Sequence, residues 1–228
     1  MIFKPPVERG LAGRPLGTTG CSESSTTMTV NPDKIVLASQ SPRRAQLLRE
    51  AGIAFEAVSP AYEEPDPHSW TGDAVGYVEM VSLKKAESVA ERFPGRVILG
   101  ADTTVALGGR MFGKPADEAD ARRILGSLSN TTHQAITGVA LHEPSARRRL
   151  IRHAVTLCRM RPLSPEELDD YIRGGGWHGK AGAYGIQDKA DAFVTIVDGS
   201  FSNVVGLPVE LVVEMLAEFG ITTSGRMP

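Results

Sequence analysis

The chain has 228 residues, 41% of them hydrophobic and 23% charged, a composition that is typical of a globular protein and excludes a disordered or fibrous one. Its formal net charge of −2 provides no general attraction for nucleic acid or anionic lipid, so we expect neither as a partner. Cys21 and Cys158 lie far apart without metal-ligand spacing, which argues against a zinc site and favours a reducing cytoplasm. The sequence shows no apolar run of about 18 residues and no secretory signal, and it therefore predicts a soluble, unexported protein.

Residues 1–32 combine several Gly, Pro, Ser and Thr residues with no apolar periodicity, and we expect them to form a poorly ordered N-terminal extension. Met28 lies just before the first expected strand, so the sequence leaves open whether residues 1–27 are a true extension or a misassigned start. We expect one folded domain over residues 33–222 and a C-terminal tail over residues 223–228.

The first pattern of the domain predicts a strand, a turn and a helix. Residues 35–38 are an apolar run, Ser41 suits an N-cap, and Pro42 suits the first helical position. Gly52 then ends the helix.

The start of this helix carries two hydroxyls and two guanidiniums, from Ser39, Ser41, Arg43 and Arg44. Free backbone N–H groups, the positive end of the helix dipole and the arginine side chains all favour an anion, so the pattern predicts a phosphate site. The alternative is a capped surface helix with two solvated arginines, and this motif taken alone favours that alternative.

Helices and strands alternate over the rest of the chain. In order, the pattern predicts a strand at 55–59, a proline-rich loop at 60–67, a helix at 73–92, a strand at 96–107 interrupted at 100–103, a hairpin turn at 108–109, a helix at 117–128, an antiparallel ribbon of 133–142 and 150–160, a helix from 164 to about 174, a strand at 192–197 and a final helix after 208. The arginine-rich segment 143–149 is expected to form the solvated tip of the ribbon, because it lacks the interleaved aromatics of a nucleic-acid site.

Asp102 stands out because it lies within a strand pattern of Val, Ile and Leu, where an acid is costly to bury unless it is paired, protonated or bound to a metal. The other unusual polar residues lie mostly next to Gly or Pro; they are Ser39, Arg43, Arg44, Glu64, Lys85, Lys114, Lys180 and Gln187. Cations beside acids are the groups that a triphosphate and its Mg²⁺ require. The sequence shows no Walker-type loop and no defensible Ser/His/Asp triad, and we expect the five histidines to be structural or surface residues.

Seven segments in order carry a resemblance to a known family. They are Leu37-Ala-Ser-Gln-Ser-Pro-Arg-Arg44, Lys85-Ala86, Leu99-Gly-Ala-Asp-Thr103, Gly113-Lys-Pro115, Thr137-Gly-Val139, Lys180-Ala-Gly-Ala-Tyr-Gly-Ile-Gln187 and Val205-Gly-Leu-Pro208. Together they closely resemble the Maf family of nucleoside triphosphate pyrophosphatases over residues 34–219. The resemblance implies an α/β fold with a mixed, elongated central sheet flanked by helices and two lobes with a cleft between them, similar to the inosine triphosphatase fold. It also implies cleavage of a nucleoside triphosphate between the α and β phosphates.

The resemblance further implies a role for each matching residue. Asp102 would be the catalytic carboxylate that either activates water or organises the metal, and Glu64 would join it at a divalent cation, Mg²⁺ or Mn²⁺. The implied phosphate ligands are Ser39, Arg44, Lys85 and Lys114. The motifs match the branch of the family specific for thymidine and uridine nucleotides at three positions, Arg43, Thr103 and Gln187, so we expect dTTP and UTP as substrates. A hydroxyl and an amide suit the edge of a pyrimidine, whereas a methylated guanine would prefer an aromatic partner to arginine.

Four positions depart from the family pattern. Gly176 and Gly179 replace acidic residues and predict a more mobile loop, Met80 stands where many members have Arg, and Asn130 replaces a usual Gly. Two alternatives stay open: a pyrophosphatase for another modified nucleotide such as 7-methyl-GTP, and a non-catalytic nucleotide-binding regulator of cell division. The sequence also leaves a homodimer open.

Overall fold

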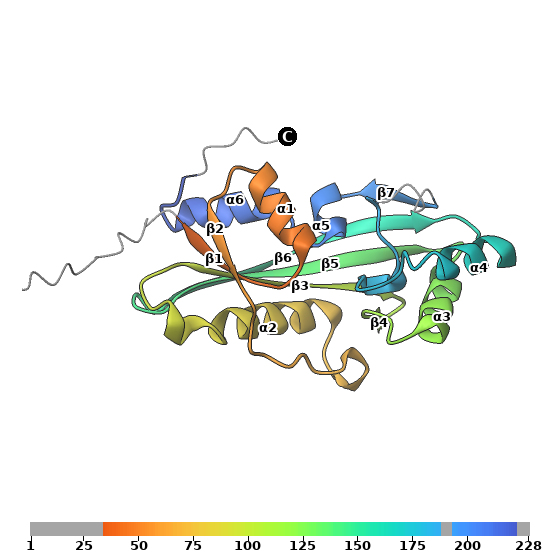
Figure 1. The fold of residues 1–228 in the computed structure, drawn as a ribbon, viewed down its shortest axis with the longest axis horizontal. Helices are drawn as coiled ribbons and strands as arrows, with labels where there is room; N and C mark the ends of the chain where they lie inside the picture. The colour runs from red at the N-terminus through yellow and green to blue at the C-terminus, as the bar shows by residue number, and fades with distance from the viewer. Residues whose placement is uncertain (1–33, 188–192, 223–228) are drawn as a thin grey trace, which may run out of the picture. The chain divides into compact units, whose positions relative to one another are not determined.

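The structure, a computed structural model, describes residues 34–187 and 193–222, and the expected N-terminal extension and C-terminal tail lie outside these residues. Its centre is a seven-stranded sheet with the strand order β2-β1-β3-β5-β6-β7, in which β4 also pairs with β3 (Figure 1). The first strand runs parallel to β2 and β3, whereas all other pairs are antiparallel. The expected mixed α/β fold is therefore confirmed.

The strands are β1 (Ile35–Ala38), β2 (Phe55–Val58), β3 (Ile98–Leu107), β4 (Arg110–Phe112), β5 (Thr132–Glu143), β6 (Arg148–Met160) and β7 (Val194–Asp198). The helices are α1 (Pro42–Glu50), α2 (Ala74–Glu87), α3 (Glu118–Leu128), α4 (Pro165–Arg173), α5 (Phe201–Val205) and α6 (Val209–Glu218). Short 3₁₀ turns lie at Pro67–Ser69, Ala90–Arg92 and Ala181–Ala183.

Short sequence patterns such as helix caps predicted most of these elements correctly. Ser41 caps α1, and the Ser164 capping box opens α4. Two expectations were wrong: the strand at β3 is continuous through residues 100–103, and the helix at α2 ends at Glu87 before a separate 3₁₀ turn. The short helix α5 was not foreseen.

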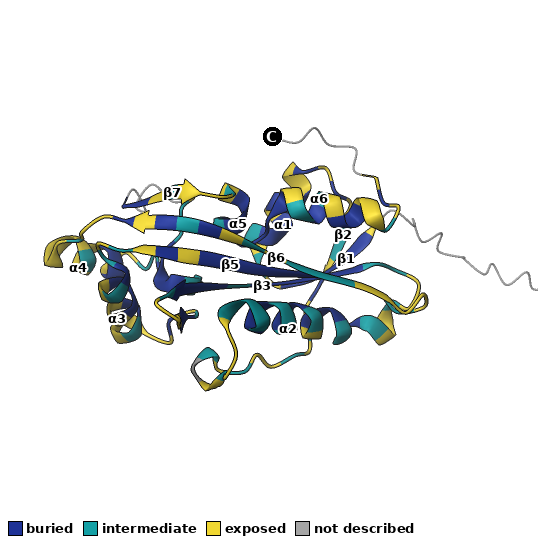
Figure 2. Cartoon of the chain, turned by 180° about the vertical axis from the view of Figure 1, so that it is seen from behind, coloured by how far each residue is buried: buried dark blue, intermediate teal, exposed yellow. Residues whose placement is uncertain are grey.

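Helices cover both faces of the sheet (Figure 1). On one face lie α1, α5 and α6, and on the other lies α2, while α3 and α4 pack together at the end of the sheet away from β1 and β2. The middle strands β3 and β5 are buried over most of their length (Figure 2). One apolar core joins β1, α1 and α6, and a second joins α3, α4 and β6. Two smaller cores lie between α2 and the sheet.

Two further observations concern the expected chemistry of the chain. Cys158 is buried and carries a free thiol, while Cys21 lies outside the described residues. Within residues 34–187 and 193–222, no helix is both long and apolar enough to span a membrane.

Candidate active site

The candidate site lies beside a gap in the sheet. On one side of β3, β1 ends at Ala38, which pairs with Gly100, and β4 begins its pairing only at Val105. In the part of the chain that the structure describes, no strand covers that side of residues 101–104. Because consecutive side chains of a strand point to opposite faces, Asp102 and Thr103 reach the same opening from the two faces of the sheet. Residues 100–103 were predicted to interrupt the strand, but they continue it and place Asp102 and Thr103 at the opening.

Three charged side chains meet on the α2 side of the gap. The ammonium Nζ of Lys85, from α2, lies 2.6 Å from Oδ1 of Asp102 and 2.6 Å from Oε1 of Glu64. Lys85 and Asp102 are buried, with side chains 6% and 7% exposed, whereas the side chain of Glu64 is 35% exposed. The buried acid therefore has the charged partner that its apolar setting demands.

Two glycines allow α2 to bring Lys85 this close to the sheet. A Cβ atom at Gly100 would lie 2.0 Å from the carbonyl oxygen of Ser82, and one at Gly138 would lie 2.3 Å from that of Val78. Gly138 stands directly opposite Asp102 in the register of β3 and β5. Any side chain at either glycine would push α2 away from the sheet. Because both positions lack a side chain, α2 packs closely and places Lys85 against Asp102.

Glu64 reaches the cluster from the proline-rich loop at 60–67. Partial burial opposes its ionisation, but the charge and hydrogen bond of Lys85, with the charges of Lys114 and Arg44, outweigh that effect and hold the pKa of Glu64 below its usual value. Nζ of Lys114, which follows β4, lies 3.9 Å from Oε1 of Glu64 and is mostly exposed. Glu64 is therefore a carboxylate at neutral pH.

Arg44 lies on the other face of the gap, at the start of α1. Its Nε donates to the carbonyl of Gly206 at 2.8 Å, its Nη1 to Oγ of Ser39 at 3.3 Å and its Nη2 to Oγ1 of Thr103 at 3.1 Å. Burial lowers the pKa of Arg44, although the charges of Asp102 and Glu64 oppose that shift. Among the described residues, no carboxylate forms an ion pair with this buried cation. A buried guanidinium held only by neutral groups is well suited to receive an anion.

A network of hydroxyl groups connects Arg44 to β5 and α5. Oγ1 of Thr103 lies 2.9 Å from Oγ1 of Thr137 on β5, which donates to the carbonyl of Asn203 in α5 at 3.2 Å. The amide of Asn203 in turn donates to the carbonyls of Ala135 and Ala154. The hydroxyl of Thr103, which was predicted to contact the base, meets Arg44, Thr137 and Gly206 in this network, and its contact to the base stays a prediction.

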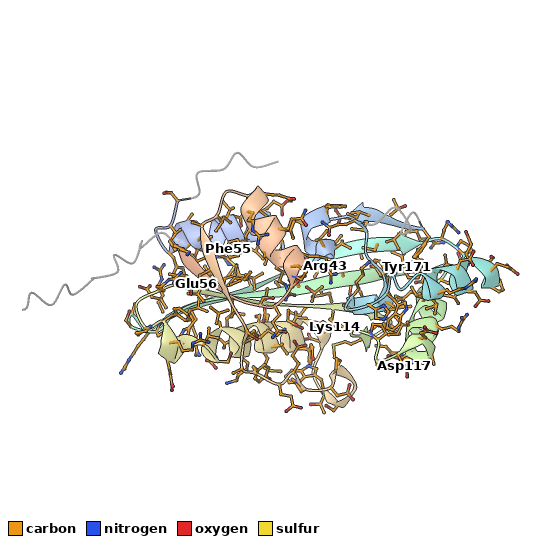
Figure 3. The ribbon with its side chains drawn as sticks, viewed as in Figure 1. Arg43, Phe55, Glu56, Lys114, Asp117 and Tyr171 are labelled. Carbon is orange, nitrogen blue, oxygen red and sulfur yellow. The ribbon has the colours of Figure 1, made fainter. Side chains whose placement is uncertain are left out.

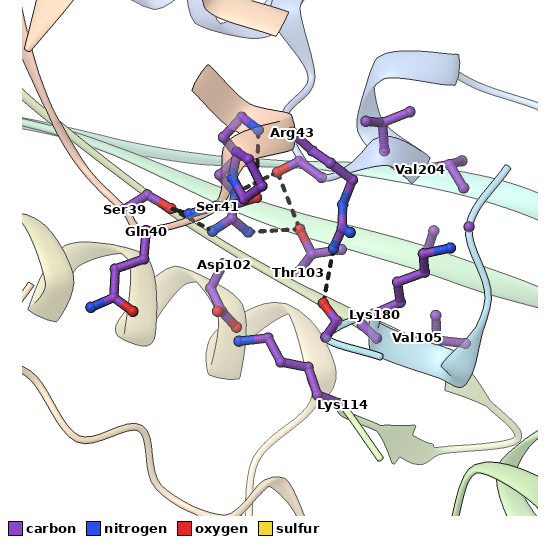
Figure 4. A pocket seen from close by; sticks show the side chains of 18 of the residues that line it. Ser39, Gln40, Ser41, Arg43, Asp102, Thr103, Val105, Lys114, Lys180 and Val204 are labelled. Atoms are coloured by element: carbon purple, nitrogen blue, oxygen red, sulfur yellow. Dashed lines mark hydrogen bonds between the residues drawn. The ribbon is translucent and has the colours of Figure 1, made fainter. Parts of the chain in front are cut away.

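The charged groups of the site border one cavity of about 860 Å³ (Figure 4). Its wall includes every site residue expected from the sequence: Ser39, Arg43, Arg44, Glu64, Lys85, Asp102, Thr103, Lys114, Lys180 and Gln187. Arg43 and Lys114 approach from opposite sides of the sheet (Figure 3). The cavity draws on α1 from one apolar core and on the turn at residues 181–183 from another.

The far wall of the cavity is a loop. Nη2 of Arg43 donates to the carbonyl of Gly179 at 2.8 Å and so ties α1 to the segment 174–187. Gln187 and His178 are exposed on this wall. Sequence reasoning did not select His178, which was expected to be a structural or surface residue. It also selected neither Asn203 nor Thr137, although Thr137 begins one of the recognised segments.

A divalent cation has only a partial site in the protein alone. No cluster of three or more His, Cys, Asp or Glu side chains suited to a metal occurs in the described part of the chain. Two carboxylates do converge, however, since Glu64 and Asp102 both contact the same ammonium. Mg²⁺ is commonly held by one or two carboxylates together with substrate phosphates and water, so this pair fits such an ion.

Comparison with known proteins agrees with this geometry. The family described as Maf-like protein matches residues 34–219. The chain belongs to the Maf family. Curated relatives named dTTP/UTP pyrophosphatase include one from Symbiobacterium thermophilum, 45% identical with 82% of this chain and 94% of the relative covered, and one from Elusimicrobium minutum, 41% identical with 82% and 99% covered.

A third relative of this Maf protein, from Chromobacterium violaceum and also named dTTP/UTP pyrophosphatase, is 41% identical, with 85% of this chain and 98% of the relative covered. Among solved structures, protein VC0702 from Vibrio cholerae aligns over 61% of this chain and 69% of its own, with a TM-score of 0.31 and 15% identity, a likeness too slight to bear on the fold.

Proposed function

We propose that this Maf protein hydrolyses dTTP and UTP to the nucleoside monophosphate and pyrophosphate. The observation that carries the proposal is the meeting of Glu64, Lys85 and Asp102 with the unpaired guanidinium of Arg44 around one cavity. Relatives with 38–45% identity bear the name dTTP/UTP pyrophosphatase, which supports the same substrates here.

Arg44, Ser39 and Lys114 hold the triphosphate. Arg44 is fixed in place by three neutral partners, so it binds phosphate oxygens without losing further conformational freedom. Lys114 is mostly exposed and reaches the same opening from the other side of the sheet. Together they neutralise charge that is present in the substrate and redistributes in the transition state.

Glu64 and Asp102 would hold a divalent cation, Mg²⁺ or Mn²⁺. When bound with the nucleotide, that cation would bring the two carboxylates and the polyanionic substrate together and withdraw charge from the phosphate oxygens. Lys85 contacts both carboxylates, and it keeps them oriented toward a single point.

Asp102 acts as the general base. Its carboxylate takes a proton from a water molecule, the water oxygen forms a bond to the α-phosphorus, and the bond from the α-phosphorus to the bridging oxygen breaks. Pyrophosphate then leaves with the electron pair of that bond. The ammonium of Lys85, 2.6 Å from Oδ1 of Asp102, holds this carboxylate in position.

Arg43 and Gln187 select the base. Both border the loop wall of the cavity, and both present N–H donors that match the carbonyls of thymine and uracil. Thr103 contributes indirectly, since its hydroxyl holds Arg44. A cytoplasmic location agrees with the free thiol of Cys158.

A substrate panel with released pyrophosphate as the readout tests the proposal. We expect dTTP and UTP to give the highest kcat/KM, with CTP and 7-methyl-GTP well below, and we expect a metal chelator to abolish the release. A preference for 7-methyl-GTP would assign the chain to another modified nucleotide. Binding of nucleotide without turnover of any member of the panel would favour the regulatory alternative.

A further inference from the structure

One aromatic pair on the loop wall has no role in the phosphate chemistry. The ring of His178 stacks on that of Trp177, with 3.7 Å between the ring centroids and 21° between the planes. Trp177 is buried, and its indole N–H donates to the carbonyl of Ile172 at 3.1 Å. Trp177 is therefore held in one position, and its ring supports the ring of His178.

The backbone of the loop holds the imidazole in one orientation. Nδ1 of His178 lies 2.8 Å from the carbonyl of Gly175, so this nitrogen carries a proton and donates it to that oxygen. Gly175 and Gly179, on either side of the pair, have φ angles of +70° and +65°, which favour glycine. Gly175 and Gly179, the second of which departs from the family pattern, thus form the turn that presents Trp177 and His178, and Arg43 anchors this turn through the carbonyl of Gly179.

One face of His178 is covered and the other is not. His178 is exposed, it borders the cavity, and Trp177 is the one aromatic ring that stacks on it among the described residues. Arg44, Lys85 and Asp102 lie at the sheet gap, whereas Gln187 lies on the same loop wall as His178. Arg43 reaches this wall from α1 through its hydrogen bond to the carbonyl of Gly179. We infer that His178 offers its uncovered ring face to the pyrimidine base of the bound nucleotide as a stacking platform.

This inference rests on the proposed function and adds a second contact to it. Stacking on an aromatic ring contributes binding energy with little regard to which base is bound, whereas Arg43 and Gln187 read the polar edge. His178 is therefore expected to strengthen binding of thymine, uracil and cytosine nucleotides alike, and to leave the phosphate contacts unaffected.

The first test compares His178→Ala with His178→Phe and uses His153→Ala, an exposed histidine of β6 paired with Glu79, as the matched control. We expect His178→Ala to raise KM for dTTP by about 10-fold with little change in kcat, and His178→Phe to restore KM. Competitive inhibition by inorganic tripolyphosphate, which has no base, should be the same in all four proteins. An unchanged KM in His178→Ala, or an equal weakening of dTTP and tripolyphosphate, would overturn the inference.

A second test does not depend on turnover. The chain has two tryptophans, so the Trp70→Phe variant leaves Trp177 as its single fluorescent indole. We expect dTTP to change this fluorescence, tripolyphosphate not to change it, and the added His178→Ala substitution to weaken the response to dTTP. This response without release of pyrophosphate would refute the proposed function alone, whereas pyrophosphate release with no response to dTTP would refute the stacking platform alone.

Discussion

The two walls of the cavity are built in different ways. The sheet wall carries Arg44, Lys85 and Asp102, all buried and all held by partners on α2 and β3 or directly after β1 and α5. The loop wall carries His178 and Gln187, which are exposed and lie on a glycine-rich segment without long secondary structure.

This difference separates the chemistry from the choice of base. Buried charges in fixed positions are suited to stabilise a transition state, because they need no rearrangement when charge develops. Exposed side chains on a loop are more easily exchanged without disturbing the core. We therefore expect changes in the sheet wall to affect every nucleotide equally, and a change at Gln187 in the loop wall to affect nucleotides according to their base.

The largest expected effect is that of Asp102→Asn, which keeps the shape of the side chain and removes its charge. The rate of pyrophosphate release from dTTP should fall on the order of 10²-fold or more, because an amide cannot accept the proton from water. A thermal melt of the same variant checks that the fold is intact. Turnover close to that of the parent would remove Asp102 from the mechanism.

Arg44→Ala and Lys114→Ala compare a buried and an exposed cation of the site. We expect kcat/KM to fall by about 100-fold for Arg44→Ala and about 10-fold for Lys114→Ala, since the buried charge is less screened by water. Arg44→Ala should also lower the melting temperature by several degrees, because the carbonyl of Gly206 and the hydroxyls of Ser39 and Thr103 lose their donor. Unchanged activity in Arg44→Ala would favour a structural role for this arginine.

Thr137→Val tests whether the hydroxyl network positions Arg44. This change keeps the shape of a fully buried side chain but removes the contact to Thr103, so we expect kcat/KM to fall by about 10-fold and Thr137→Ser to restore it. Thr156→Val is the control, because Thr156 is equally buried and bonds to Ser200 and Asn203 but has no contact with Thr103 or Arg44. If both valine variants lost activity equally, the network would serve general stability alone.

We expect the smallest effect on activity at His133, which anchors the loop wall to the sheet. The prediction for this residue concerns the stability of the fold. Its Nε2 lies 2.8 Å from the hydroxyl of Tyr184, and burial lowers its pKa from 6.5 to about 4. Between these values the unfolded chain binds more protons than the folded one, so stability should decrease as pH falls from 6.5 to about 4, by about 3 kcal/mol in all.

Urea unfolding at a series of pH values measures this dependence. His133→Gln can keep a hydrogen bond to Tyr184 without titrating, and it should remove that part of the pH dependence. Equal slopes for the parent and the variant would show that His133 does not titrate differently on folding.

The sequence predicted the structure of the sheet wall more completely than that of the loop wall. The N-cap at Ser41, the turn at Gly108 and the acid within the apolar strand are local signals, and they located α1, the β3–β4 hairpin and Asp102. Contacts between distant segments leave no such local signal. The hydrogen bond from Arg44 to Gly206 joins residues 162 positions apart. The stack of His178 on Trp177 depends on the conformation of a glycine-containing turn, which the sequence does not predict because glycine adopts many backbone conformations.

The separation of the two walls is tested most directly by the ratio of kcat/KM for dTTP to that for CTP in two variants. Lys114→Ala should lower both values by the same factor and leave the ratio as in the parent. Gln187→Ala should bring the ratio toward unity, because the amide that distinguishes the base edges is gone. A ratio that changes in Lys114→Ala, or that stays constant in Gln187→Ala, would contradict the division of the cavity into a catalytic and a selecting wall.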